Sequence, residues 1–157
     1  MKIKIVLAIA LLFFSLKINS QATKFTPTTY IEKYNPIATD LMNEHKIPVS
    51  VILGISMLES GYGTSKLSVN KHNYFGIKKG KYYRGYNNDI ESFNDFCALV
   101  KRKKFYNNLV SNDIKDYNIW LTNLKKIGYS TSSDWQKKVT DYINKYQLYK
   151  YDVLCID

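Results

Sequence analysis

The chain has 157 residues, with 23 Lys and Arg against 13 Asp and Glu, and its formal net charge is +10 at pH 7. A hydrophobic fraction of 45% is enough for a buried core, and the presence of only 7 Gly and 3 Pro excludes collagen-like and low-complexity chains. Two cysteines are too few for a small disulfide-rich scaffold. The length favours a single domain.

Residues 1–20 have the pattern of a secretory signal peptide. Lys2 and Lys4 precede an apolar run that ends at Leu16. This run falls within the roughly 7–15 residues of a signal peptide and is shorter than the roughly 20 residues that span a bilayer. A buried N-terminal helix and an uncleaved membrane anchor are the alternatives. We expect cleavage before Gln21, export to the periplasm or cell wall, no stable membrane anchor, and a single domain over residues 21–157.

The first helix of the mature chain is predicted at Thr26, with Pro27 as its first residue. A second start pattern at Pro36 predicts that this helix breaks and restarts. Residues 49–58 are apolar on nearly every side, which predicts a buried central helix. Gly61 is the expected left-handed residue that ends it.

A loop follows over residues 61–80. We expect residues 74–78 to pair with residues 81–88 as a small β-hairpin that turns at Lys79-Gly80. Amphipathic helices then begin at Asp89 as N-cap, near Tyr117, and at Ser132 or Ser133. The predicted fold is α+β and mainly helical, with a small β-hairpin lobe after the central buried helix.

Glu59 stands out because it closes the buried helix. The partial negative charge at a helix C-terminus and the loss of solvent both disfavour an ionised carboxylate. Both effects raise the pKa of Glu59 toward neutrality, where a protonated carboxylic acid can act as the general acid in glycosidic cleavage. An ordinary surface glutamate just past a helix end is the alternative.

Several ordered blocks of the sequence resemble glycoside hydrolase family 73, which contains peptidoglycan N-acetylglucosaminidases of the flagellar and autolysin type. The resemblance covers about residues 28–152. The blocks are Tyr30–Tyr34, Ile47–Gly63, Asn73–Lys78, Tyr86–Phe93, Gly128–Thr131 and Tyr146–Asp152. The resemblance implies a lysozyme-like fold, with Glu59 as the catalytic acid and Tyr129 as its helper. Tyr129 could instead be a core aromatic next to a glycine cap.

A second catalytic acid is harder to find. Glycosidases usually place two carboxylates about 5–5.5 Å or roughly 6.5–9.5 Å apart. Residues 61–88 contain no Asp or Glu, and the nearest candidates are Asp89 and Glu91 at the start of the next helix. For Glu91 a structural role as an N-terminal helix acid is the alternative. We therefore expect a one-acid mechanism, in which the substrate's own N-acetyl oxygen or a water held by Tyr129 meets the oxocarbenium-like centre.

The 14 tyrosines provide candidate sugar contacts, because aromatic faces pack against the apolar faces of sugars. Core and strand packing is the alternative for each of them, and Asn73 and Phe75 are also expected to shape the loop that borders the groove. Lysines make the lobe basic, which suits the carboxylates of peptidoglycan. The candidate substrate-binding residues are Tyr62, Asn73, Tyr74, Phe75, Tyr83 and Tyr86.

Cys97 and Cys155 could form a disulfide in an exported protein, which would contribute about 3–4 kcal/mol, or they could be two free thiols. His45 and His72 are isolated in sequence, so neither a metal site nor Cys–His chemistry is expected. We expect no cofactor, and a monomer.

The sequence therefore predicts a peptidoglycan hydrolase whose partner is the glycan strand, most directly an endo-β-N-acetylglucosaminidase. A muramidase or lytic transglycosylase of the same fold is the near alternative, and a non-catalytic wall-binding module is the distant one. The positive charge and the aromatic residues also suit a nucleic-acid binder. The signal peptide and the absence of a recognition motif argue against that reading.

Overall fold

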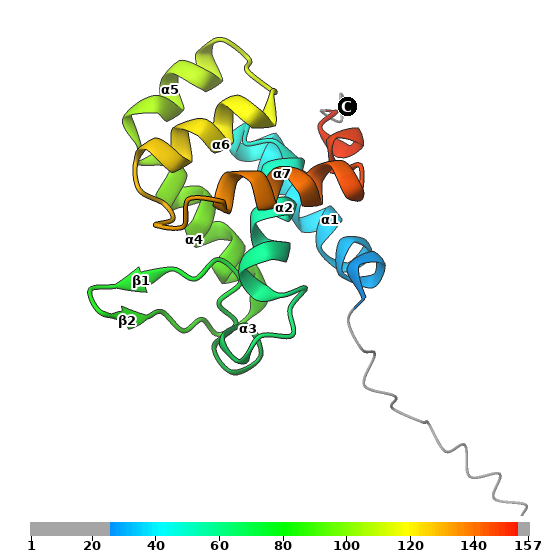
Figure 1. Cartoon of the computed structure of the whole chain (residues 1–157), viewed down its shortest axis with the longest axis vertical. Coiled ribbons are helices and arrows are strands. Elements are labelled where there is room, and N and C mark those ends of the chain that lie inside the picture. The colour runs from blue at the N-terminus through cyan, green and yellow to red at the C-terminus, as the bar shows by residue number, and fades with distance from the viewer. Residues whose placement is uncertain (1–25, 154–157) are drawn as a thin grey trace, which may run out of the picture.

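The fold is built around α2, which other helices surround (Figure 1). The computed structural model describes residues 26–153, so the predicted signal peptide and Cys155 lie outside the described residues. In chain order the elements are α1 (Pro27–His45), α2 (Val49–Ser60), α3 (Lys66–Lys71), β1 (Lys78–Lys79), β2 (Tyr82–Tyr83), α4 (Asp89–Lys101), α5 (Lys104–Ser111), α6 (Tyr117–Lys126), α7 (Trp135–Lys145) and the 3-10 turn η1 (Leu148–Tyr151). The prediction of a mainly helical α+β domain with one small hairpin is confirmed.

Helix α1 begins as predicted but does not break. The Thr26 side chain accepts a hydrogen bond from the Thr29 backbone N–H at 3.2 Å, and Pro27 is the first helical residue. The expected interruption at Pro36 is wrong, because one helix runs through it. Pro36 and Glu32, one turn earlier, both lie on the exposed face. The Glu32 carbonyl that loses its helical donor therefore faces water, which lowers the cost of an internal proline.

Helix α2 is buried and ends as predicted. Gly61 adopts the left-handed conformation, with φ 55°, and its N–H closes the last turn. Gly54 allows α7 to pack closely, because a Cβ atom there would lie 2.8 Å from a side-chain carbon of Ile143. Asp152 holds the opposite end of the helix by accepting hydrogen bonds from the Ser50 backbone N–H at 2.8 Å and from its hydroxyl at 2.6 Å. The catalytic-acid candidate therefore ends a helix that is fixed along its length.

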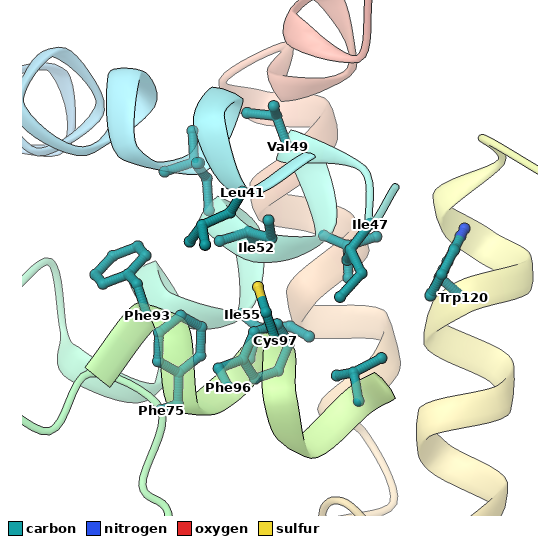
Figure 2. Packing of buried hydrophobic residues seen from close by; sticks show 14 of the residues in the cluster. Leu41, Ile47, Val49, Ile52, Ile55, Phe75, Phe93, Phe96, Cys97 and Trp120 are labelled. Carbon is teal, nitrogen blue, oxygen red and sulfur yellow. The ribbon is translucent and has the colours of Figure 1, made fainter. Parts of the chain in front are cut away.

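The hydrophobic core lies between α1, α2 and α4 (Figure 2). Phe75, which precedes the hairpin, stacks on Phe96 of α4 with ring centroids 4.3 Å apart. Phe93 contacts Phe75 edge-on at 4.9 Å. Cys97 is fully buried beside these rings, and Trp120 brings α6 to the core. This packing attaches the base of the hairpin lobe to the helical body.

The hairpin is shorter than predicted and turns one residue later. β1 and β2 pair antiparallel with Lys78 opposite Tyr83, so the turn is Gly80-Lys81 and not Lys79-Gly80. The residues before Lys78 are not a strand, because the Asn73 side chain binds both the N–H and the carbonyl of Ile77, at 3.1 and 2.9 Å. That polar clamp makes residues 73–77 a tight loop.

Two predicted helix starts are wrong by one or two residues. Helix α4 is capped by Asn88, whose side chain accepts from the Glu91 N–H at 3.0 Å, and Asp89 is the first helical residue. The Asp89 carboxylate instead turns toward α1. Helix α7 has Asp134 at its N-cap position and not Ser132 or Ser133, and Asp134 pairs with Lys138 one turn on, at 2.8 Å. Helices α3 and α5 were not predicted.

No helix in the described part of the chain is long and apolar enough to cross a bilayer.

Candidate active site

A cleft of about 430 Å³ opens between the hairpin lobe and the loop that joins α6 to α7. Glu59 lies at its wall, next to Tyr129 and the loop residues Phe75 and Gly76. The cleft collects segments that lie far apart in the sequence. Its lining residues are Glu59, Phe75, Gly76, Ile77, Lys78, Tyr83, Leu99, Lys103, Ile127, Gly128, Tyr129, Ser130 and Thr131. Glu59 is the one carboxylic acid in that lining.

The two oxygens of Glu59 have different surroundings. Oε1 accepts a hydrogen bond from the indole Nε1–H of Trp135 at 2.9 Å. Oε2 lies against the backbone of Gly76, where an added Cβ atom would approach it to 3.6 Å. Burial raises the pKa of Glu59 above its ordinary value of 4.5, and the Trp135 hydrogen bond partly offsets that rise. The expected direction of this shift is confirmed.

Trp135 is the contact that sequence reasoning missed. Its position in an amphipathic helix indicated a core residue, and it is indeed 3% exposed. An indole has a single N–H donor, which usually finds a partner when the ring is buried. That requirement is met here by Glu59, 76 positions earlier in the chain. The sequence indicated a buried tryptophan and a buried acid, but no pattern in it indicated that the two side chains are in contact.

Tyr129 lies beside Glu59, as the family resemblance implied. Its hydroxyl donates to the Phe75 carbonyl at 3.0 Å, and its ring packs 5.3 Å from that of Trp135. Burial, followed by the nearby Glu59 charge, raises the pKa of Tyr129 well above its ordinary value. The phenol is therefore protonated at physiological pH. Because its hydrogen is engaged, the oxygen can still accept one from a water molecule.

Asn73 and Phe75 shape this part of the cleft from behind. Asn73 is fully buried, and its amide also donates to the Arg84 carbonyl at 2.9 Å, which ties both ends of the hairpin together. Phe75 is 2% exposed and contributes mainly its carbonyl, the acceptor for Tyr129. The two residues fix the wall that faces Glu59.

Tyr83 is the hairpin tyrosine that reaches the cleft. Its ring is 46% exposed, which leaves a face available to a sugar. The Lys78 ammonium, from the opposite strand, lies 4.7 Å from the centre of this ring. The pair forms a wall that is both aromatic and positively charged.

The other candidate tyrosines do not line the cleft. Tyr74 is 4% exposed, and its hydroxyl lies 2.7 Å from the Tyr34 hydroxyl in the core. Tyr86 donates to Asp95 at 2.7 Å. Tyr62 packs on α7, with its ring 5.4 Å from that of Tyr142. Their observed contacts are hydrogen bonds and ring packing within the fold.

Glu91 lies outside the cleft lining. Its carboxylate accepts hydrogen bonds from the Asn87 backbone N–H at 3.0 Å and from the Asn87 amide at 2.9 Å. These bonds lower the pKa of Glu91. Neighbouring Asp89 accepts from Lys33 at 2.9 Å and from Tyr34 at 2.7 Å. Neither Asp89 nor Glu91, the candidates for a second acid, is among the residues that line the cleft with Glu59.

Cys97 has no exposed surface, and its proposed partner Cys155 is not among the described residues, so their pairing stays a prediction. Within residues 26–153, no three His, Cys, Asp or Glu side chains gather as a metal site requires.

Comparisons with known proteins identify the family of this chain. Residues 35–148 match the model of the glucosaminidase family, described as mannosyl-glycoprotein endo-beta-N-acetylglucosaminidase. The chain belongs to the glucosaminidase family. The matched segment includes Glu59, Trp135 and Tyr129. The resemblance to glycoside hydrolase family 73 is thereby confirmed.

Three similar proteins place this glucosaminidase-family chain among known folds. Exo-glucosaminidase LytG of Bacillus subtilis is 27% identical over 78% of this chain, which spans about half of that protein (52%). The catalytic domain of the autolysin Auto from Listeria monocytogenes superposes with a TM-score of 0.70 at 24% identity, covering 80% of this chain and 87% of that one. The glycoside hydrolase domain of FlgJ from Salmonella typhimurium gives 0.61 at 18% identity, covering 78% and 89%. These structures confirm the lysozyme-like fold.

Proposed function

We propose that this chain hydrolyses the β-1,4-linked glycan strand of peptidoglycan at N-acetylglucosaminyl bonds, with Glu59 as the general acid. The observation that carries the proposal is the state of Glu59. It is the one carboxylic acid lining a 430 Å³ cleft, its pKa is raised by burial, and an indole N–H fixes its orientation. A positioned acid whose pKa is raised keeps its proton to higher pH than an ordinary glutamic acid, which favours protonation of the leaving group.

The Trp135 hydrogen bond supports one position for the acidic proton of Glu59. Because Oε1 accepts the Trp135 N–H, the acidic hydrogen belongs on Oε2, the oxygen near Gly76. Oε2 then donates to the bridging oxygen as the glycosidic bond breaks. The leaving sugar takes the proton, and Glu59 becomes a carboxylate that the Trp135 hydrogen bond stabilises.

The departing sugar leaves an oxocarbenium-like centre that needs a nucleophile. The substrate's own N-acetyl oxygen is one candidate, and a water that donates to the Tyr129 oxygen is the other. Tyr129 itself is not a general base, because its pKa lies well above the ordinary value of 10.0. The cleft lining holds no second carboxylate. We therefore favour the one-acid mechanism, with either of these candidates as the nucleophile, over a catalytic role for Glu91.

The pattern of residues 1–20 supports a proposal for where the reaction takes place. We propose that residues 1–20 direct export, that the mature chain acts as a monomer at the cell wall, and that Tyr83 contributes an aromatic sugar contact. Tyr62, Tyr74 and Tyr86 then support the site through packing.

LytG is named an exo-glucosaminidase, whereas the family description is of an endo-enzyme. The sizes of the products distinguish endo cleavage from exo cleavage.

The experiment is digestion of purified sacculi by the mature chain, followed by reduction of the new ends and mass spectrometry. Reduced N-acetylglucosamine at the new ends is the expected result. Reduced muramic acid would identify a muramidase, and anhydro ends a lytic transglycosylase. Binding to sacculi without any released fragment would identify a wall-binding module and contradict the proposal. Early appearance of long fragments indicates endo cleavage, and early release of the smallest units indicates exo cleavage.

A further inference from the structure

Two lysines line the same cleft from different elements. Lys78 belongs to β1 of the hairpin, and Lys103 lies at the junction of α4 and α5. No ion pair among the described residues includes either side chain. Other lysines of the chain, such as Lys33 and Lys138, have carboxylate partners within 3 Å. The two cleft ammonium groups are therefore available to an anion.

The charge of the cleft is one-sided. Its lining holds two lysines, Lys78 and Lys103, against a single acid, Glu59. Such a cleft attracts an anionic ligand, and low-polarity walls strengthen this attraction. A neutral polysaccharide could accept hydrogen bonds from the two ammonium groups, but it would gain no charge–charge attraction from them.

An apolar surface lies beside Lys103. Ile127 is 42% exposed, and Leu99 of α4 is partly buried against the core. Both line the cleft together with Lys103. An ammonium next to exposed methyl groups matches a ligand that carries a carboxylate beside an apolar carbon. The lactyl ether of muramic acid has this composition, and so do amino acids of the stem peptide.

We propose that Lys103, together with Lys78, forms a carboxylate subsite that makes the enzyme prefer anionic glycan strands over neutral ones. This subsite rests on the proposed function, because it selects among the substrates of the same cleft. It deepens that function by making the muramyl unit, with its lactyl or stem-peptide carboxylate, a recognised group. Lys103 was not singled out by any motif in the sequence.

The test compares kcat/KM on three substrates. The first is peptide-free strands with free lactyl carboxylates, the second is the same strands with those carboxylates converted to methylamides, and the third is strands that retain their stem peptides. For Lys103→Gln we expect about a fivefold loss on one or both carboxylate-bearing substrates and less than a twofold loss on the methylamides. Lys78→Gln should behave in the same way, and Lys103→Arg should retain the preference.

Neighbouring lysines provide matched controls. Lys104 and Lys79 are exposed, lie next to the two subsite residues and do not line the cleft. Substituting either by Gln makes the same change in net charge and should alter kcat/KM by less than twofold on every substrate. Raising the ionic strength should reduce the preference of the wild type and leave that of the double variant Lys78→Gln/Lys103→Gln nearly constant.

The substrates whose kcat/KM falls identify the group that supplies the bound carboxylate. A loss confined to peptide-free strands assigns the lactyl group, and a loss confined to peptide-bearing strands assigns the stem peptide. Equal losses on the free and methylamidated strands, or equal losses in the control variants, would overturn the subsite while leaving the hydrolase intact. If the wild type cleaved none of the three substrates, the proposed function itself would fail, and the subsite with it.

Discussion

The end of α2 and the start of α4 both present carboxylic acids, but their surroundings act on the pKa in opposite directions. Glu59 receives one hydrogen bond, from a neutral indole, and burial raises its pKa. Burial would also raise the pKa of Asp89, but hydrogen bonds from Lys33, Tyr34 and His72 outweigh it and lower the pKa to about 2. The number and charge of the donors therefore decide the direction in which each pKa shifts.

The same difference separates the roles of the two regions. A carboxylate with three donors is a structural anchor, and Asp89 joins α1 to α4 and to the loop after α3. An acid with one neutral donor and an oxygen facing a cleft can release a proton to a ligand. Substitutions at these two acids and at the neighbours of Glu59 therefore test the comparison.

The largest effect is expected from Glu59→Gln. An amide fits the same space but has no acidic proton, so release of reducing ends from sacculi should fall by about 1,000-fold or more. Glu91→Gln is the matched control, because it makes the same chemical change at an acid outside the cleft lining. Its rate should stay within about twofold of the wild type. An equal fall in both variants, with both folded, would contradict the one-acid mechanism.

The next largest effect is on stability. Asp89→Asn leaves three donors around a neutral amide and should lower the free energy of unfolding by about 2 kcal/mol at pH 7. Because the folded pKa of about 2 lies below the ordinary 3.8, this contribution is complete above pH 4 or so and disappears as the pH falls toward 2. Urea unfolding at several pH values measures it. A difference between wild type and variant that stayed constant below pH 4 would argue against the anchor role.

Trp135→Phe tests how the hydrogen bond from Trp135 affects the pKa of Glu59. The variant keeps an aromatic ring but removes the N–H that favours the ionised form of Glu59, so the pKa of Glu59 should rise further. The alkaline limb of the pH–rate profile should move to higher pH, and kcat should fall about tenfold because Oε1 is no longer held. A fall in kcat with an unshifted limb would mean that Trp135 acts by packing alone.

Tyr129→Phe separates the two candidate nucleophiles and has the smallest expected effect. If a water is held by the hydroxyl, kcat should fall about fivefold while KM changes little. Stability should fall by about 1 kcal/mol, because the hydrogen bond to the Phe75 carbonyl is lost. Unchanged turnover alongside that loss of stability would exclude the water and favour the N-acetyl oxygen of the substrate.

Local patterns predicted the helical frame and the catalytic-acid candidate well. The apolar run of α2 and the glycine that ends it are properties of adjacent residues, and so is the position of Glu59. Helix α1 shows the limit of such patterns. Whether a proline breaks a helix depends on which face it occupies, and Pro36 lies on the exposed face.

Contacts between distant segments were not predictable in the same way. The Glu59–Trp135 hydrogen bond joins α2 to α7, and Lys103 reaches the cleft only because α4 packs beside the hairpin lobe. The tyrosines illustrate the same limit, since Tyr74 and Tyr83 look alike in sequence but lie in the core and in the cleft. Tyr129 was predicted as a site residue from the family resemblance, and the periodicity of the chain did not indicate it.

The most direct test of the account is a ¹³C NMR titration of the Glu59 carboxyl carbon in the mature wild-type chain, with Glu59→Gln used to assign the signal. The account predicts a midpoint above the ordinary 4.5, and a midpoint for Asp89 in the same experiment near 2. A Glu59 midpoint at or below 4.5 would show that the site does not raise the pKa of this acid, and it would contradict the role of Glu59 as the proton donor.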